Sequence, residues 1–333
     1  MGGVPRPVGR RLEAGRRYPP SVDRSAFHLG GWRTAAASLD VDIVELGDGF
    51  LRLDGWLLVR GATVGVDSVA TWQLAGDKGV ARRLLVEAGL PVTVDRPADR
   101  AHLRQLIERP ADAQTLVIKP GRDTGAGAGV TVGPSTRREI VAAITEARRL
   151  SPAVQIEEAV SGDIVRALVV EGELLDAVVR RPARIQGDGR LTVDELVDAE
   201  NARRRSLPGG PTGFIPRTTD YRVQLRRQRR SPGARLQLGE RVTVSGRSNT
   251  GSELESRRTT LSTEAHRAAV DACRALGVRI GGVDLVVDDG RLSAVLEVNT
   301  TPGLHWHTLV ADEPFPVFER LLAAVLASHR GGQ

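Results

Sequence analysis

The sequence predicts an α+β (α/β) fold with more than one domain. Its 333 residues make a chain about twice the usual length of a domain. Short apolar runs typical of strands alternate with amphipathic segments typical of helices, and two pairs of strands are separated by hairpin turns. Hydrophobic residues make up 41% and charged residues 26% of the chain, a balance that excludes a largely disordered protein.

The N-terminal part divides into a tail and a small cap. Residues 1–25 are rich in arginine and proline without periodicity, which indicates a mobile tail. Residues 26–76 contain apolar stretches at 41–46 and 56–59 and predict a small α/β cap. No apolar run approaches the roughly 20 residues of a membrane helix, and no secretory signal opens the chain. A single cysteine, Cys273, fits a reducing compartment, so a soluble cytoplasmic protein is expected.

Helix and strand signals continue along the rest of the chain. Asp77 begins a helix that Gly89 and Pro91 end. Thr136 and Glu139 form a capping box for a helix that runs to about residue 150. The remaining predicted strands are 115–119, 130–132, 154–157, 164–170, 174–179 and 241–245, and the remaining predicted helices begin near Thr192 and Ala265.

The basic residues are almost all arginine. Of 47 basic residues only Lys78 and Lys119 are lysine, a ratio that a GC-rich genome explains. A surviving lysine is then expected where the planar fork of arginine would not serve. Between Arg203 and Arg230 lie nine arginines and one acid. Because aromatic residues are scarce there, this segment favours a solvated face or a site for an acidic substrate over nucleic-acid binding.

A glycine-rich loop lies between two predicted strands. Residues 121–129 contain four glycines, whose backbone N–H groups can converge on an anion. The loop lacks the Gly-Lys-Ser/Thr of a Walker motif, and a strand follows it where a dinucleotide fingerprint would open a helix. A flap over phosphates and a plain flexible hairpin therefore both remain open. Lys119, at the end of the preceding strand, can place a point charge on phosphate oxygens under the loop.

The segment 281–303 predicts a hairpin. Asp289-Gly290 is a strong two-residue turn signal, and it places Asp288 opposite Arg291. With that register, alternate residues of both strands form one apolar face suited to a core. The predicted core face consists of Val283, Leu285, Val287, Leu292, Ala294 and Leu296.

Three polar residues fall on the opposite face of this hairpin. Asp284 is predicted diagonal to Glu297, with Asn299 two residues further along. Two carboxylates and an amide oxygen are ligands of the kind that Mg²⁺ prefers, and Mn²⁺ accepts the same set. The alternative is a solvated face of an edge hairpin, against which the apolar Val286 and Val295 on that face indicate partial burial.

Taken together, the order of these motifs resembles the ATP-grasp superfamily, whose members hold ATP between two α+β subdomains. The residues that carry the resemblance include Asp77-Lys78, Val117-Ile-Lys119-Pro120, Glu157-x₄-Gly162-x₃-Arg166 and Glu297-Val-Asn299-Thr-Thr-Pro302-Gly303. The resemblance implies a small subdomain over residues 77–160, with the glycine flap, and a large one over 161–330, with the Mg²⁺ site.

A closer resemblance is to the ATP-grasp half of cyanophycin-synthetase-type ligases. It rests on Arg180-x-Pro182-Ala183, on Gly187-Asp188-Gly189, and on Arg247-Ser-Asn249-x-Gly251. The Mur-ligase-like half of those enzymes is absent, so the chain is not expected to be that enzyme. Homodimers are common among similar ligases, and the sequence leaves the oligomeric state open.

The resemblance also implies roles for individual residues. In many relatives an acid contacts the ribose where Ile164 stands, and Asp163 is the candidate substitute; His305 and His307 are candidate substrate contacts that a structural role would explain as well. The implied ATP-binding residues are Lys78, Lys119, Gly125, Gly127, Gly129, Glu157, Glu158, Ala159, Val160 and Asp163, the implied metal ligands are Asp284, Glu297 and Asn299, and the implied residues near the transferred phosphate and substrate carboxylate are Arg180, Arg247 and Asn249.

The expected activity is ATP-dependent ligation of a carboxylate to an amine, on an amino acid or small peptide, through an acyl phosphate. Positioning and electrostatics supply nearly all the catalysis of such a reaction, so no nucleophilic side chain is required. Two alternatives remain: a kinase that passes phosphate to a small molecule, and a nucleotide-binding partner protein without turnover.

Overall fold

The computed structural model describes residues 24–121, 127–206, 213–251, 256–308, 310 and 315–331. The tail predicted at residues 1–25 lies outside the described residues except for its last two, and Gly125 of the glycine loop also lies outside them. Among the described helices, none combines the length and the apolar character needed to cross a membrane.

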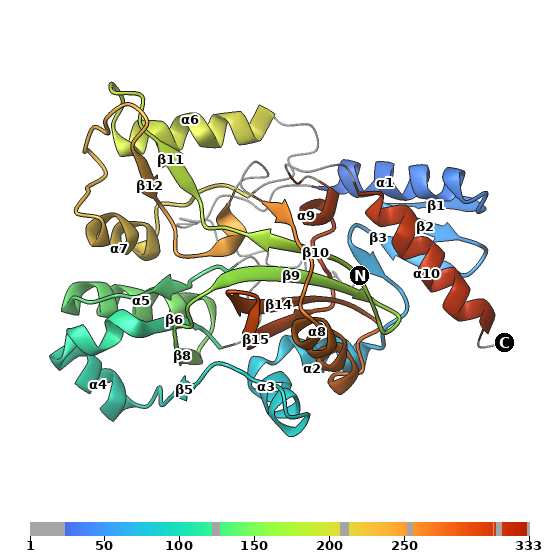
Figure 1. The fold of residues 1–333 in the computed structure, drawn as a ribbon, viewed down its shortest axis with the longest axis horizontal. Coiled ribbons are helices and arrows are strands. Elements are labelled where there is room, and N and C mark those ends of the chain that lie inside the picture. Colours follow the sequence, from blue (N-terminus) through green and yellow to red (C-terminus); the bar gives the residue numbers. More distant parts are fainter. Residues whose placement is uncertain are drawn as a thin grey trace, which may run out of the picture.

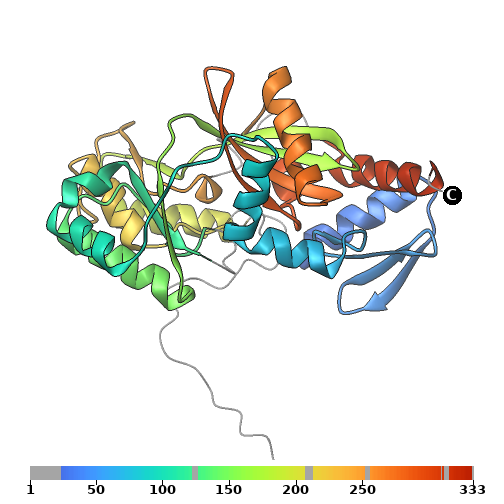
Figure 2. The same ribbon diagram turned by 90° about the horizontal axis from the view of Figure 1, so that it is seen from below.

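The first core joins the two ends of the described chain. Helix α1 (Ser25–Ser38) lies beside helix α10 (Val317–Gly331), as Figures 1 and 2 both show. Trp32 and Phe318 pack edge to face in this core, with ring centroids 5.0 Å apart. The helices cover a four-stranded antiparallel sheet formed by β1 (Ile43–Gly47), β2 (Phe50–Leu53), β3 (Leu57–Arg60) and β4 (Thr63–Val64).

The second unit is a sheet on which only the last two of the next four helices pack, because the first two contact residues 291–299 of another sheet instead. The side chain of Asp77 accepts hydrogen bonds from two amides at the start of α3 (Lys78–Glu87), and Thr136 and Glu139 form the predicted capping box of α5 (Arg137–Leu150). Helix α2 (Val69–Gly76), helix α4 (Arg100–Glu108) and the 3₁₀ turn Pro110–Thr115 were not predicted. The sheet has the order β5 (Asp95–Arg96), β8 (Val154–Glu158), β6 (Leu116–Pro120) and β7 (Thr131–Val132).

A five-stranded antiparallel sheet forms the centre of the molecule (Figure 1). Helix α8 (Thr263–Ala275) covers one face, where Val165, Ala167 and Val169 of β9 point. On the other face Leu168 belongs to the core around α1 and α10, and Arg166 borders a cavity. The sheet has the order β13 (Arg257–Arg258), β10 (Glu173–Arg180), β9 (Asp163–Val170), β14 (Ile280–Asp288) and β15 (Arg291–Asn299).

The predicted register of the β14–β15 hairpin is correct only near its turn. Asp288 lies opposite Arg291 as predicted, but two irregularities further along each add one residue to β15. Asp284 therefore lies directly opposite Glu297, where a diagonal placement was predicted. The two residues that the register skips are Ser293 and Leu296, and neither is a glycine, the residue that would mark one common type of bulge in the sequence.

These bulges also exchange residues between the two faces of β15. Val295, predicted on the polar face, packs in the core under α8. Leu296, predicted in the core, lines the cavity instead, and Ala294 pairs with Val286 on the cavity side. An extra residue reverses the alternation of side chains beyond it, so both corrections have the same cause.

The third unit is a lobe built from residues 183–244 with a core of its own (Figure 1). Reciprocal hydrogen bonds between Thr192 and Glu195 confirm the predicted start of α6 (Val193–Ser206). Helix α7 (Thr219–Arg227) lies within the arginine-rich segment and was not predicted. The lobe also contains β11 (Arg184–Gln186) and β12 (Arg241–Thr243), and the 3₁₀ turn η2 (Ser248–Thr250) and the short helix α9 (His305–Thr308) follow later in the chain.

Candidate active site

A cavity of about 440 Å³ lies where the second unit, the central five-stranded sheet and the segments around residues 213 and 246–249 meet. Most of the residues implied by the sequence line it, although they come from strands and loops far apart in the chain. Gly129 and Asp163 are not among its lining residues. Those that line it are Lys78, Lys119, Gly127, Glu157, Glu158, Ala159, Val160, Arg180, Arg247, Asn249, Asp284, Glu297 and Asn299.

Two arginines hold the carboxylate of Asp284. Arg166 on the neighbouring strand donates from Nε to Oδ1 at 2.6 Å and from Nη2 to Oδ2 at 3.0 Å, and Nη2 of Arg180 lies 2.7 Å from Oδ2. Burial opposes ionisation of this carboxyl, yet the charges of Arg166 and Arg180 outweigh it and hold the pKa of Asp284 far below its ordinary value. Asp284 is therefore a carboxylate throughout the physiological range.

The three oxygen-bearing side chains lie together. Glu297 faces Asp284 across the hairpin, and Nδ2 of Asn299 donates to Oε1 of Glu297 at 3.0 Å. The described residues contain no cluster of three or more His, Cys, Asp or Glu side chains suited to a metal. The protein would thus supply two carboxylates and one amide oxygen, and Mg²⁺ commonly completes such a partial set with phosphate oxygens and water.

Both lysines of the protein border the cavity. Nζ of Lys119 lies 2.7 Å from Oε2 of Glu157, which also accepts from Oγ1 of Thr93 at 2.9 Å. Nζ of Lys78 lies 3.5 Å from the carbonyl oxygen of Pro120. Burial lowers the pKa of Lys78, and the nearby charge of Lys119 adds to this against the raising effect of Glu297. Two cations held this close favour an anion between them.

The backbone after β8 presents an edge to the cavity. The amide of Glu158 donates to Val94 O at 2.9 Å and that of Ala159 to Thr115 O at 2.7 Å. Within the described chain the amide of Val160 has no such acceptor, and the residue lines the cavity. This segment can therefore donate a main-chain hydrogen bond to a ligand.

The other end of the cavity carries unsatisfied polar atoms. Among the described residues, buried atoms without a hydrogen-bond partner include Nε of Arg180, Nε of Arg247, Oδ1 of Asn249 and both ring nitrogens of His305. All four residues line the cavity. Leaving such atoms unpaired costs about 1–3 kcal/mol each, so the arrangement fits a polar ligand that completes their bonds.

Known proteins resemble this chain along most of its length, although no protein-family model matches it. It is 24% identical over 329 residues to the glutathione biosynthesis bifunctional protein GshAB of Enterococcus faecalis, covering 88% of this chain and 43% of that protein. It is 28% identical over 249 residues to the cyanophycin synthetase of Nostoc sp., covering 71% of this chain and 27% of that protein. The chain therefore spans less than half the length of these relatives.

A structural comparison decides the fold. The crystal structure of a bifunctional glutathione synthetase from Pasteurella multocida superposes with a TM-score of 0.55 and 22% identity, covering 90% of this chain and 43% of that one. The chain has the ATP-grasp fold. The predicted fold class is thereby confirmed, and so is the resemblance to ATP-grasp ligases, which covers only their ATP-grasp part.

Gly129 and Asp163, both implied as ATP-binding residues, do not line the cavity. The side chain of Asp163 is 53% exposed and lies 3.7 Å from Arg181, whereas Ile164 borders the cavity. The candidate substitute for the ribose-binding acid therefore lies outside this cavity. Gly129 has a φ of +71°, and a Cβ there would come within 2.9 Å of both Leu150 and Pro120, so close packing explains this glycine.

The two histidines that follow the Pro-Gly turn differ in their surroundings. His307 is fully buried, its Nδ1 lies 2.8 Å from Oδ2 of Asp176, and Arg258 binds the other oxygen of that carboxylate at 2.9 Å. His307 does not line the cavity, so its role is structural. His305 does line it, and burial lowers its pKa well below the ordinary value, which keeps the imidazole neutral.

The arginine-rich segment does not supply the substrate pocket that the sequence left open. None of its nine arginines, all of which are described, lines the cavity. Instead Arg203 and Arg204 pair with Glu200, and Arg226 pairs with Glu139. Ion pairs within the chain therefore neutralise part of this charge.

Two residues near the cavity were missed as site residues. Arg166 was noted only as part of a motif. Asp220 is completely buried and accepts hydrogen bonds from the amides of Val132 at 3.1 Å and Gly246 at 2.8 Å, which joins the base of the glycine loop to the segment before Arg247. A signal existed for Asp220, since it is the one acid among the nine arginines.

Proposed function

We propose that the protein is an ATP-dependent ligase that joins a carboxylate to an amine, with an amino acid or a small peptide as substrate. The proposal is carried by one observation: both lysines, the backbone segment that follows β8 and the oxygen ligands of the β14–β15 hairpin all line the same cavity. The relatives named as ligating or synthesising enzymes support the same class of reaction.

The nucleotide end of the cavity is formed by β6, β8 and α3. The amide of Val160 would donate to the adenine, and Lys78 and Lys119 would bind phosphate oxygens as point charges. Asp284, Glu297 and Asn299 would hold Mg²⁺, or Mn²⁺ with the same ligands, and the metal would neutralise charge on the phosphates. The residues present therefore fit both groups.

The substrate end is formed by Arg180, Arg247, Asn249 and His305. Arginines whose Nε atoms are unsatisfied are suited to binding the substrate carboxylate and orienting it toward the γ-phosphate. ATP would activate that carboxylate as an acyl phosphate, which the amine then attacks with release of phosphate. Arg180, Arg247 and His305 are buried, and this burial would keep water from the reacting groups.

The test is a turnover assay on defined pools. The protein is incubated with ATP, Mg²⁺ and pools of amino acids and dipeptides, and ADP, phosphate and new product masses are followed. We expect ADP formation that requires both a carboxylate and an amine, with a product whose mass is the sum of both substrates less one water. A stable phosphorylated product would instead establish a kinase, and tight ATP binding without turnover on any pool would establish a binding role.

Matched variants check the metal ligands in the same assay. Glu297→Gln should abolish turnover because it removes a carboxylate ligand while preserving size. Asp163→Asn, at an acid of the same sheet outside the cavity, should retain it. Full activity of Glu297→Gln would refute the assignment of the metal site.

A further inference from the structure

Arg204 is the most deeply buried arginine of the arginine-rich segment. Its side chain is 0% exposed, whereas the side chain of Arg203 is 35% exposed and Arg205 lies on the surface. Burying a guanidinium is costly unless it is paired and hydrogen-bonded. Dispersed surface charge explains the exposed arginines beside Arg204, but it does not explain why the guanidinium of Arg204 is buried.

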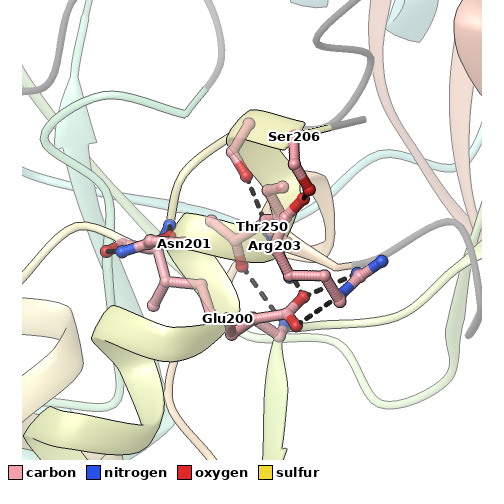
Figure 3. A network of polar contacts seen from close by, with 9 residues as sticks. Glu200, Asn201, Arg203, Ser206 and Thr250 are labelled. Carbon is pink, nitrogen blue, oxygen red and sulfur yellow. Dashed lines mark hydrogen bonds and ion pairs between the residues drawn. The ribbon is translucent and has the colours of Figure 1, made fainter. Parts of the chain in front are cut away.

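The guanidinium of Arg204 joins three separate parts of the chain. Nε donates to Oε1 of Glu200 at 2.7 Å, one turn earlier on α6. Nη1 donates both to the carbonyl oxygen of Gly213 at 2.6 Å and to that of Thr250 at 2.8 Å. Figure 3 shows Glu200 and Thr250 gathered with Asn201 near the C-terminal end of α6.

Both carbonyl groups belong to segments that form the substrate end of the cavity. Gly213 itself lines the cavity. Thr250 ends the turn η2, which carries Asn249, and its Oγ1 donates to the carbonyl oxygen of Arg247 at 2.7 Å. The guanidinium therefore holds two cavity-forming segments at a fixed separation.

A second side chain on α6 strengthens the same connection. Nδ2 of Asn201 donates to Ile215 O at 3.1 Å, and Ile215 N donates back to Oδ1 at 2.8 Å. Asn201 is itself buried, and Ile215 belongs to the core of the lobe. The last turns of α6 thus act as a rigid support for the segment that begins at Gly213.

We propose that Arg204 is a positioning residue that holds the segments of Gly213 and of Arg247–Thr250 together and so sets the geometry of the substrate end of the cavity. The proposal rests on the proposed function for the meaning of that end. The nucleotide end is built from β6, β8 and α3, none of which Arg204 contacts through a hydrogen bond. Its effect is therefore larger on the carboxylate or amine substrate than on ATP, to which it connects only through Arg247, whose Nη1 donates to Gly127 O at 2.7 Å.

Lysine cannot take over this role. The planar fork of Arg204 directs Nε to Glu200 and Nη1 to both carbonyl oxygens at once, whereas an ammonium is a point charge on a flexible stem. Arg204→Lys therefore preserves the charge and the pairing with Glu200 but gives up the simultaneous contacts to both carbonyls. Glu200→Gln is the second variant, since it weakens the orientation of the guanidinium without burying a new charge.

The experiment measures local opening and binding separately. Hydrogen–deuterium exchange of the full-length variants should become at least ten-fold faster than wild type in segments 213–216 and 248–251, and remain unchanged in 156–160. The Kd of a fluorescent ATP analogue should stay within two-fold of wild type. With the amino-acid or dipeptide pool that supports turnover, KM for that pool should rise at least ten-fold while KM for ATP stays constant.

Arg230→Lys is the matched control, because Arg230 pairs with Glu240 in the same lobe and borders no part of the cavity. It should leave exchange in both segments and both KM values unchanged. Wild-type exchange in segments 213–216 and 248–251 of Arg204→Lys and Glu200→Gln would overturn the proposal, as would an equal loss of ATP-analogue binding. If Arg204→Lys fails to fold, Glu200→Gln decides. If the wild-type protein shows no turnover, the proposed function fails. The hydrogen–deuterium exchange of the variants still tests the positioning role of Arg204.

Discussion

Arg166 on β9 and Asp284 on β14 face each other across adjacent strands and form a bidentate ion pair, with N–O distances of 2.6 and 3.0 Å. Both side chains are only 7% exposed. The pair lies on the cavity face of the central sheet, and its Asp284 is one of the three ligands proposed for the metal. Removal of Arg166 would leave Asp284 paired with Arg180 alone, whereas removal of Asp284 would leave two buried guanidinium groups without the carboxylate that they share.

Arg166→Met should therefore lower the free energy of unfolding by about 3 kcal/mol, the lower end of the usual cost of breaking a buried ion pair from one side, because Arg180 still pairs with Asp284. Chemical denaturation of the purified protein measures the change. Arg33→Met, which removes an ion pair to Glu45 whose side chains are 50% and 55% exposed, should cost less than about 1 kcal/mol. Equal losses in the two variants would show that Asp284 does not depend on Arg166.

Lys119→Met should weaken binding of ATP about 10- to 100-fold, because it removes one charge-assisted hydrogen bond to a phosphate. Titration with a fluorescent ATP analogue measures the Kd. The substitution also frees Glu157, which then repels the phosphates, so Lys119→Met with Glu157→Gln should bind better than Lys119→Met alone. Unchanged affinity in Lys119→Met would place the phosphates elsewhere.

Cys273 should resist thiol reagents at pH 8 in the native protein. Burial, with a smaller effect of Asp67, raises the pKa of its thiol from 9.0 to about 12, and the thiolate is the reactive form. The thiol should react fully after denaturation. Since the folded pKa is raised, the protonated thiol favours the folded state below pH 9.0, and this contribution is lost as the pH rises toward about 12. Rapid native labelling at pH 8 would contradict the buried placement.

The two histidines of α9 should respond oppositely to replacement by leucine. His307→Leu removes the hydrogen bond to Asp176 and should lower the free energy of unfolding by about 1–3 kcal/mol. His305→Leu removes two unpaired buried nitrogens and should be neutral or stabilising. Thermal and chemical denaturation compare them. A loss for His305→Leu as large as that for His307→Leu would mean that His305 has a structural partner.

Much of the local structure was predictable because its causes are local. Asp77 and Thr136 begin helices through hydrogen bonds to amides two or three residues away, and both predicted starts agree with the structure. The turn at Asp289-Gly290 was found for the same reason, and Asp289 adopts a φ of +47° there. Helix α7 escaped prediction because its polar surface and its arginines obscure the apolar spacing of Tyr221 and Leu225, which pack in the core of the lobe.

The individual residues of the candidate site could be predicted from the sequence, but the ion pairs and hydrogen bonds between them could not. The rarity of lysine marked Lys78 and Lys119, and both border the cavity. Nothing in the chain near Asp284 indicates that its partner is Arg166, 118 residues earlier. Such pairings depend on which strands become neighbours, and that is settled only by packing of the whole sheet.

The sequence by itself determined the helix caps, the hairpin turn, the fold class and the residue types available for chemistry, since each of these follows from neighbours along the chain. Tertiary structure alone decided the two bulges that bring Glu297 opposite Asp284 and turn Leu296 into the cavity. It also separated Arg204 from Arg205, adjacent and chemically identical side chains. Arg204 is buried because it donates to Glu200 and to carbonyl oxygens of two other segments, whereas Arg205 lies on the surface with its guanidinium 5.6 Å from the ring of Phe214.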